Sequence, residues 1–242
     1  MKLKIVNMYP DILNMYGDIG NLKSINQRAK WRGIETEIIN FTTDSDENSL
    51  DDDVDIILVG GGSDHGQTIV SNHLVKQRNV LENYIEEDKF ILAICGSYQM
   101  FGNVYIDKDD NSIPCLELFD IETKSGPTRM IGDILIESTL KLEPNTIIGF
   151  ENHGGETFHN YQALGTVKIG YGNNRQDNLE GMIYKNFIGT YLHGSLLPKN
   201  PQLADYIILK ALQKKYDIDK LIQLNDIVEF KAHENMKKRL IE

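Results

Sequence analysis

Apolar runs of strand length alternate with helix-like patterns through the first hundred residues. These runs predict strands at residues 3–8, 35–41, 56–59 and 90–94. Helical periodicity predicts helices at residues 21–32, ending at Gly33, and at residues 71–86. Strands joined by helices are typical of a mostly parallel sheet, in which the active site lies beyond the carboxyl ends of the strands.

The second half of the chain reads as β-rich. Strands separated by Gly, Pro and Asn turns are predicted at residues 130–138, 146–150, 166–169 and 187–192. Asn200 and Pro201 are typical of an N-cap and a first helical turn, so we expect a helix to residue 215 and a charged helical segment to residue 242. The segment 42–55, crowded with Asp, Glu and Ser, should form a solvated loop or a short exposed helix. Since no proline-rich linker interrupts the chain, we expect a single α/β domain over residues 1–242, with helices flanking a central sheet.

Composition narrows the classes of function. A net charge of −11 and a pI near 5.0 argue against broad nucleic-acid binding, which needs a basic surface. The only cysteines are Cys95 and Cys115, without the spacing of a metal site, so we expect neither a disulfide framework nor a bound metal. The start lacks the apolar segment of a signal peptide, and no run approaches the ~20 apolar residues of a membrane span. These features predict a cytoplasmic chain.

The stretch KFILAICGSYQMFG, residues 89–102, carries the strongest candidate for chemistry. Cys95 lies between an apolar strand and a helical pattern, with the small residues Ala93, Gly96 and Ser97 around it. This junction resembles a nucleophile elbow, in which a strained turn exposes the nucleophile. The free N–H groups at the start of a helix also favour a thiolate. The alternative is a buried cysteine that only packs after a core strand.

A glycine run at residues 60–62 follows one of the predicted strands. Its sequence, GGGSDHG, has neither the GxGxxG spacing of a dinucleotide site nor the GK[ST] ending of a phosphate loop. One interpretation is that Gly61 or Gly62 lends a backbone N–H to an oxyanion hole, together with Gly96. The other is a tight turn without a chemical role.

A thiolate nucleophile needs a base, and position separates the six histidines. His193 follows a predicted core strand, as the cysteine does, so both can reach the same sheet edge. His153, in the segment FENHGG, also follows a predicted strand and is the competing base. His73 and His233 fall in predicted surface helices, where a solvated histidine is the ordinary case. The pairing of Cys95 with His193 is therefore the better hypothesis.

These residues resemble a known family. The segment AICGSYQ is similar to the cysteine signature of class I, triad-type glutamine amidotransferases, G-x-C-x-G-x-Q, with Cys95 as nucleophile and Gln99 on the glutamine side. Ala93 and Ser97 replace the two signature glycines and are small enough for the elbow. FENHGG and GTYLHG resemble the cobyric acid synthase-like branch. The start, IVNMYPDILNMYGDIGN, resembles the stand-alone glutaminase subunits of lipid II isoglutaminyl synthases, the GatD family.

The resemblance implies a class I amidotransferase fold and hydrolysis of L-glutamine to glutamate and ammonia. Cys95 would form the thioester, His193 would move the protons, and backbone N–H groups would hold the oxyanion. Arg129, in the predicted loop KSGPTRM, matches the arginine that holds glutamine in the GatD family. Many class I members carry an acid two residues after the histidine, where this sequence has Ser195. A dyad, or a triad completed by a partner's carboxylate, is what the resemblance implies, and the isolated chain should then be a weak glutaminase.

The resemblance also implies a partner, because no segment of the chain binds ATP in an evident way. The partner would be a Mur ligase-like subunit of the MurT type, joined to this chain as a heterodimer. ATP and Mg²⁺ would bind in the partner, which would amidate the D-glutamate of lipid II to D-isoglutamine. This chain would need no cofactor, and would meet the inner membrane face only through the lipid-linked substrate.

Three other functions stay open at this point. The chain could supply ammonia to a different carboxylate acceptor, such as a corrinoid. It could be a non-catalytic glutaminase-like subunit that regulates a partner, an idea motivated by the missing acid. It could also be a cysteine peptidase or stress-type hydrolase on the same sheet, which would leave Arg129 and Gln99 without a task.

Overall fold

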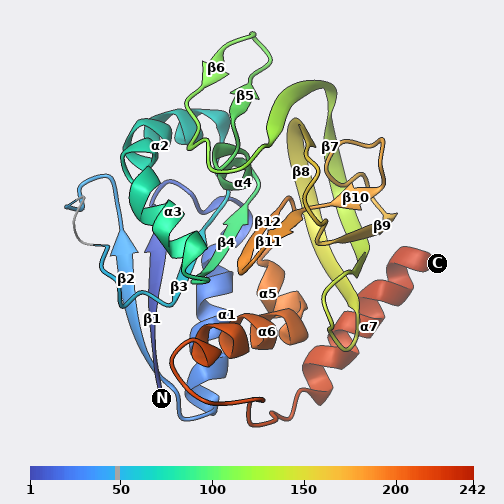
Figure 1. Cartoon of the computed structure of the whole chain (residues 1–242). Helices are drawn as coiled ribbons and strands as arrows, with labels where there is room; N and C mark the ends of the chain where they lie inside the picture. The colour runs from blue at the N-terminus through green and yellow to red at the C-terminus, as the bar shows by residue number, and fades with distance from the viewer. Residues whose placement is uncertain (47–49) are drawn as a thin grey trace.

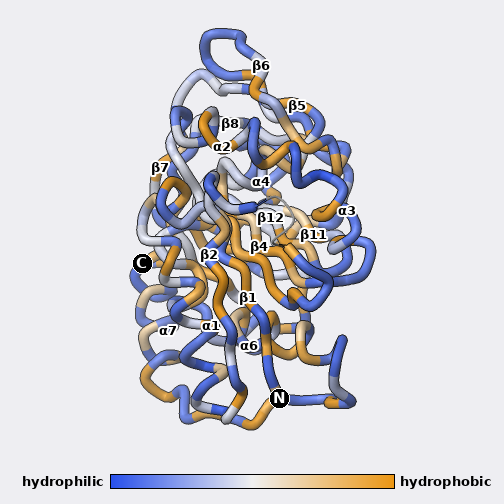
Figure 2. The backbone as a smooth tube through the Cα atoms, turned by 90° about the vertical axis from the view of Figure 1, so that its left-hand side faces the viewer, coloured by the Kyte–Doolittle hydropathy of each residue, from blue (hydrophilic) through white to orange (hydrophobic). Residues whose placement is uncertain are grey.

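The parallel sheet predicted from the first half is present in the computed structural model, which describes residues 1–46 and 50–242. Its strands are β1 (Lys2–Met8), β2 (Glu35–Phe41), β3 (Ile56–Val59), β4 (Phe90–Ile94), β11 (Met182–Tyr184) and β12 (Phe187–Thr190). They lie in the order β11-β12-β4-β3-β1-β2 (Figure 1), and every neighbouring pair is parallel except β11 and β12. β3 and β4 are buried along their whole length, as expected for continuous apolar runs in a parallel sheet, and β4 is uniformly apolar in Figure 2.

Seven helices and one 3-10 turn are found in the described part of the chain. They are η1 (Met15–Gly17), α1 (Ile19–Trp31), α2 (Asp64–Lys76), α3 (Arg78–Glu86), α4 (Gly96–Met100), α5 (Leu196–Lys199), α6 (Pro201–Gln213) and α7 (Ile227–Ile241). The single helix predicted at residues 71–86 is wrong, because α2 and α3 are separate helices that meet at the buried Gln77. α2 also begins earlier than predicted, where the Ser63 side chain accepts the N–H of Gly66.

The β-rich second half forms another sheet, with β7 to β10 at the right of Figure 1. Its strands are β5 (Val104–Ile106), β6 (Ser112–Ile113), β7 (Glu122–Ser138), β8 (Thr146–Phe158), β9 (Gly165–Ile169) and β10 (Leu179–Glu180). The order is β10-β9-β7-β5-β6, and β8 pairs antiparallel with β7. β7 and β8 extend well beyond the predicted strands, because their pairing continues on both sides of Gly126 and Pro127, which look like a turn in the sequence. The register shifts between Ser125 and Met130, which marks a bulge in β7.

Buried charges tie the C-terminal helices to α1. Arg28 contacts Asp205 of α6 at 2.7 Å and Asp226 at the start of α7 at 2.6 Å, and its side chain is only 4% exposed. Arg32 contacts Asp205 as well, at 2.7 Å. A guanidinium is costly to bury unless carboxylates match it, so this network fixes the segment that follows α6. The predicted C-terminal helices are confirmed, with α6 ending two residues before the predicted residue 215.

Two histidines that were predicted to be solvated are not. His233 in α7 is 2% exposed, and its ring contacts the hydroxyl of Thr146 at 3.0 Å and the carbonyl of Lys199 at 2.9 Å. His73 in α2 is partly buried and contacts the Tyr9 hydroxyl at 2.9 Å. Helical periodicity alone cannot show that a second element covers the face on which a polar ring lies. In the segment 42–55 the described residues form a loop without a helix, as predicted, but Leu50, Val54 and Asp55 are buried and not solvated; residues 47–49 lie outside the described ranges.

The two sheets meet where the parallel strands end. Phe150 of β8 and His193 exchange backbone hydrogen bonds of 3.2 and 2.7 Å. Because β3, β4 and β12 are parallel neighbours, the residues that follow them lie at one edge of the sheet. Over residues 1–46 and 50–242, no helix is both long and apolar enough to cross a membrane.

Candidate active site

Cys95 lies on the predicted strand-to-helix junction, between β4 and α4. Its backbone is left-handed, with φ 53° and ψ −111°, a conformation that costs a non-glycine residue on the order of 1–3 kcal/mol. The carbonyl of Thr190 holds the turn by accepting the Cys95 N–H at 2.7 Å. Gly96 follows directly, and a Cβ there would come within 2.0 Å of the Gln67 amide, so a larger residue would have to displace that buried side chain. Local strain of this kind is typical of a nucleophile held out of a regular element.

His193 follows β12 and lies beside the cysteine. Its side chain is fully buried, and Nδ1 lies 3.2 Å from Oδ2 of Asp18. Burial lowers the pKa of His193, but the charges of the Cys95 thiolate and the Asp18 carboxylate outweigh it and raise the pKa to about 10. Nε2 has no hydrogen-bond partner within the residues that the structure describes. The ring is therefore held at one nitrogen and available for proton transfer at the other.

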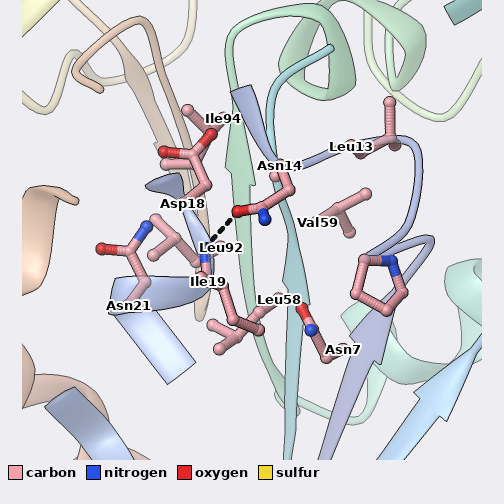
Figure 3. A pocket seen from close by; sticks show the side chains of 12 residues that line it. Asn7, Leu13, Asn14, Asp18, Ile19, Asn21, Leu58, Val59, Leu92 and Ile94 are labelled. Atoms are coloured by element: carbon pink, nitrogen blue, oxygen red, sulfur yellow. Dashed lines mark hydrogen bonds between the residues drawn. The ribbon is translucent and has the colours of Figure 1, made fainter. Parts of the chain in front are cut away.

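Asp18 is the acid that sequence reasoning missed. It precedes α1, where an Asp normally reads as an N-cap, but it makes no capping bond; the Asn14 side chain accepts the Ile19 N–H instead, at 2.8 Å (Figure 3). The Asp18 side chain is 2% exposed and lines a cavity of about 10 Å³, room for about one water molecule. The sequence predicted a dyad, or a triad completed by a partner's carboxylate, and the structure instead places a carboxylate of the same chain against His193. The prediction of a weak isolated glutaminase stays a prediction.

Asp18 also changes the role that the glycine run, residues 60–62, can have. Its Oδ2 accepts the N–H of Gly61 at 2.7 Å, so Gly61 is wrong as an oxyanion donor. Gly61 instead makes room for the base, since a Cβ there would come within 2.2 Å of the His193 ring. Gly62 lines the same pocket as Cys95 and remains the candidate donor from this run. The hydroxyl of Ser97 donates to the Gly60 carbonyl at 2.5 Å, so this departure from the family signature fixes the run against the elbow.

A pocket of about 450 Å³ opens in front of Cys95. Arg129 lines it from the bulge of β7, not from a loop as predicted, and a bulge is a common means of turning a side chain toward a site. Its Nε donates to Oδ1 of Asn152 at 3.0 Å. Gln99 also lines the pocket, although it is 2% exposed and its amide nitrogen donates to the Tyr191 hydroxyl at 3.0 Å. The structure thus brings Cys95, Gln99 and Arg129 to one cavity.

His153, the competing base, is held in a different way. Its ring stacks on Tyr191 with 3.6 Å between centroids, and Nδ1 donates to the Gly155 carbonyl at 2.8 Å. Burial lowers the pKa of His153, which keeps the ring neutral. Its Nε2 lies 3.7 Å from a carboxylate oxygen of Glu151. This geometry makes His153 a wall of the pocket and favours His193 as the base.

Cys115 is no rival nucleophile. Burial raises the pKa of its thiol to about 11, and Sγ lies 3.4 Å from the carbonyl of Ile113. Among the residues described, no three His, Cys, Asp or Glu side chains are grouped to hold a metal ion. The chemistry available here is that of a thiolate, an imidazole and backbone N–H groups.

Comparisons with known proteins identify the family of this chain. Residues 4–201 match the CobB/CobQ-like glutamine amidotransferase domain. The chain is 43% identical over 214 residues to subunit GatD of lipid II isoglutaminyl synthase (glutamine-hydrolyzing) from Staphylococcus aureus (strain N315), a match that covers 88% of this chain and 86% of that protein. Identity to GatD of Streptococcus pneumoniae (strain ATCC BAA-255 / R6) is 37% over 223 residues, covering 90% and 84%. A glutamine amidotransferase from Thermotoga maritima has a similar fold, with a TM-score of 0.55 and 14% identity, and the match covers 98% of this chain and 93% of that one. The predicted fold class is therefore confirmed. The chain belongs to the CobB/CobQ-like glutamine amidotransferase family.

Proposed function

We propose that this chain is the glutaminase subunit of a lipid II isoglutaminyl synthase. It hydrolyses L-glutamine and supplies ammonia to a partner that amidates the D-glutamate of lipid II. The observation that carries the proposal is a strained Cys95 turn beside an imidazole that a carboxylate of the same chain holds. The two GatD proteins support the choice of acceptor, because each aligns with most of this chain and is named as a subunit of that synthase.

Hydrolysis begins when the Cys95 thiolate attacks the side-chain amide carbon of glutamine. The N–H groups of Gly62 and Gly96 stabilise the oxyanion that forms. His193 is protonated at neutral pH because its pKa is raised, so Nε2 can give its proton to the departing ammonia and leave a thioester. The neutral ring then takes a proton from water, whose attack on the thioester releases glutamate and restores the thiolate.

Asp18 sets which ring nitrogen does this work. Since its Oδ2 accepts from Nδ1 of His193, the proton that moves is the one on Nε2. The same oxygen accepts the Gly61 N–H, which fixes the carboxylate in place. The idea of a non-catalytic regulatory subunit arose from a missing acid, and Asp18 removes that motive.

Substrate binding is assigned to the pocket in front of Cys95. Arg129 can take the α-carboxylate of glutamine, since a guanidinium matches a carboxylate with two parallel hydrogen bonds. Gln99 lies against Gly155, where a Cβ would come within 2.3 Å of its amide nitrogen, and so shapes the glutamine side of the cavity.

The ammonia acceptor is proposed to be a Mur ligase-like subunit of the MurT type, in a heterodimer with this chain. ATP and Mg²⁺ would bind in that partner, because a carboxylate must be activated before ammonia can form an amide with it. The chain described here supplies the nucleophile, the base and the glutamine pocket, and needs no cofactor for these steps.

Glutamate release by the complex of the two subunits is the test. The parent complex should hydrolyse glutamine and, with ATP and lipid II, yield amidated lipid II, whereas a Cys95→Ala complex should do neither with glutamine as donor. External ammonium chloride should restore amidation by the Cys95→Ala complex, which shows that the partner is intact. A parent complex that releases no glutamate would refute the glutaminase assignment, and hydrolysis without amidation of lipid II would refute the acceptor.

A further inference from the structure

Asn152, in the FENHGG segment, lies between Arg129 and Tyr16 at the mouth of the pocket. Arg129 donates to it twice: Nε to the side-chain oxygen at 3.0 Å, and Nη2 to the backbone carbonyl at 3.0 Å. Two bonds to one residue fix both the position and the plane of the guanidinium. The mechanism proposed above gives this residue no role.

The bonds to Asn152 leave one edge of the Arg129 guanidinium free. A guanidinium has five N–H groups, and the bonds to Asn152 use the one on Nε and one on Nη2. Two N–H groups on Nη1 and one on Nη2 are left, and one N–H from each of these nitrogens forms the edge that pairs with a carboxylate through two parallel bonds. Arg129 is an exposed side chain, so a partner that orders it in advance lowers the entropy lost when substrate binds.

Tyr16 fixes the orientation of Asn152 in turn. Because Oδ1 of Asn152 must face the Arg129 donor, its Nδ2 faces the Tyr16 hydroxyl and donates to it. The Tyr16 ring packs edge-on against His193, with 5.2 Å between centroids and an interplanar angle of 70°. Tyr16 is also left-handed, at φ 56°, and 42% exposed, a costly state for an aromatic residue that has only a packing role.

The geometry points to Asn152 and Tyr16 as positioning residues that hold Arg129 with its Nη1/Nη2 edge open to the α-carboxylate of glutamine. The inference rests on the proposed glutaminase function and deepens it, because it names what selects an α-amino acid over a simple amide. Through Tyr16, the same contacts connect the Arg129 guanidinium, which binds the α-carboxylate, with the ring of His193.

The test uses Asn152→Ala and Tyr16→Phe in the complete complex. Loss of hydrogen bonds to a charged group should raise the KM for glutamine about ten- to hundredfold in Asn152→Ala, and loss of one hydroxyl about three- to tenfold in Tyr16→Phe. Little change in kcat is expected in either, because the contacts hold substrate and transition state alike. Tyr171→Phe is the matched control, since Tyr171 is 43% exposed and its ring contacts Arg175 outside the pocket.

Labelling of Cys95 separates positioning from structural damage. Acivicin, an amino-acid electrophile, should react more slowly with both variants than with the parent, whereas iodoacetamide, which lacks a carboxylate, should react at the parent rate. An unchanged KM in Asn152→Ala, or equal slowing with both reagents, overturns the inference. If instead the parent complex hydrolyses no glutamine, it is the proposed function that fails.

Discussion

Replacing Asp18 by Asn would change the charge beside the base and leave its shape. In the parent, Oδ2 accepts from both the Gly61 N–H and Nδ1 of His193. A carboxamide offers one acceptor and one donor in place of two acceptors. If the NH₂ takes the place of Oδ2, it donates to the ring, so Nδ1 becomes an acceptor, the ring proton moves to Nε2, and the Gly61 N–H loses its acceptor. That tautomer cannot take a proton from water.

The size of the effect follows from two losses. The Asp18 carboxylate is one of the charges that raise the pKa of His193 to about 10, so the variant holds less imidazolium at neutral pH. The ring also loses its orientation. In serine-protease triads the same exchange lowers kcat by about 10⁴, and loss of a general base generally costs about 10²–10⁴. We expect Asp18→Asn to lower kcat by about 10²–10⁴, with a far smaller change in KM because Asp18 does not line the glutamine pocket.

The assay is glutamate release over a pH series, with and without the ligase-like partner. The parent should keep its imidazolium as pH rises toward about 10, and the variant should lose it at lower pH, so the alkaline limb of the rate profile should move down. Thermal unfolding of the variant serves as the control, since Asp18 is buried. Parent-like kcat in the isolated variant would refute the triad. Loss in isolation with full recovery in the complex would show that a partner carboxylate can replace Asp18.

Three further predictions follow from other parts of the chain. Cys95→Ser should abolish glutamate release with the fold intact by circular dichroism, and Cys115→Ala should retain it, because burial holds the pKa of that thiol at about 11. Burial raises the pKa of Glu180 to about 8, so between about pH 4.5 and 8 the folded chain holds a proton that the unfolded chain has lost. In that range the free energy of unfolding therefore falls by up to about 1.4 kcal/mol for each unit by which the pH rises. Denaturant unfolding of Glu180→Gln should show that slope removed, and an unchanged slope would contradict the assignment. Arg28→Ala should lower the free energy of unfolding by about 3–5 kcal/mol, since it removes the guanidinium that pairs with the largely buried Asp226, whereas Asp205 keeps Arg32. A loss below about 1 kcal/mol would mean that the network is only a surface contact.

The central sheet could be predicted because its signal is local. β3 and β4 are continuous apolar runs, and each lies within the predicted bounds because a strand buried on both faces needs apolar side chains throughout. The full lengths of β7 and β8 could not be predicted, because each strand extends only where it pairs with the other. Gly126 and Pro127 look like a turn in the sequence, but pairing with β8 resumes on both sides of them. A single sequence does not carry that long-range pairing as a pattern.

In the candidate site, too, residues with a local sequence signal could be predicted and residues placed by long-range contacts could not. Cys95 and His193 could be found because each follows a strand, and parallel strands end together. Asp18 could not, because its contact with His193 spans 175 residues and an Asp before a helix already has an ordinary explanation as a cap. The error on Gly61 follows from that omission, since the availability of its N–H depends on where the Asp18 carboxylate lies.

Ser195 connects the segment that carries Asp18 with the segment that carries His193. It occupies the position at which many class I amidotransferases carry their acid, and here its hydroxyl donates to the Gly17 carbonyl at 2.5 Å. That bond fastens the residue next to Asp18 to the segment that carries His193. α1 also packs closely against Ser195, because a Cβ on Gly20 would come within 2.2 Å of the Ser195 oxygen. A carboxylate in the place of this hydroxyl would set its charge against the Gly17 carbonyl, so the contact that fastens Gly17 to position 195 would be lost.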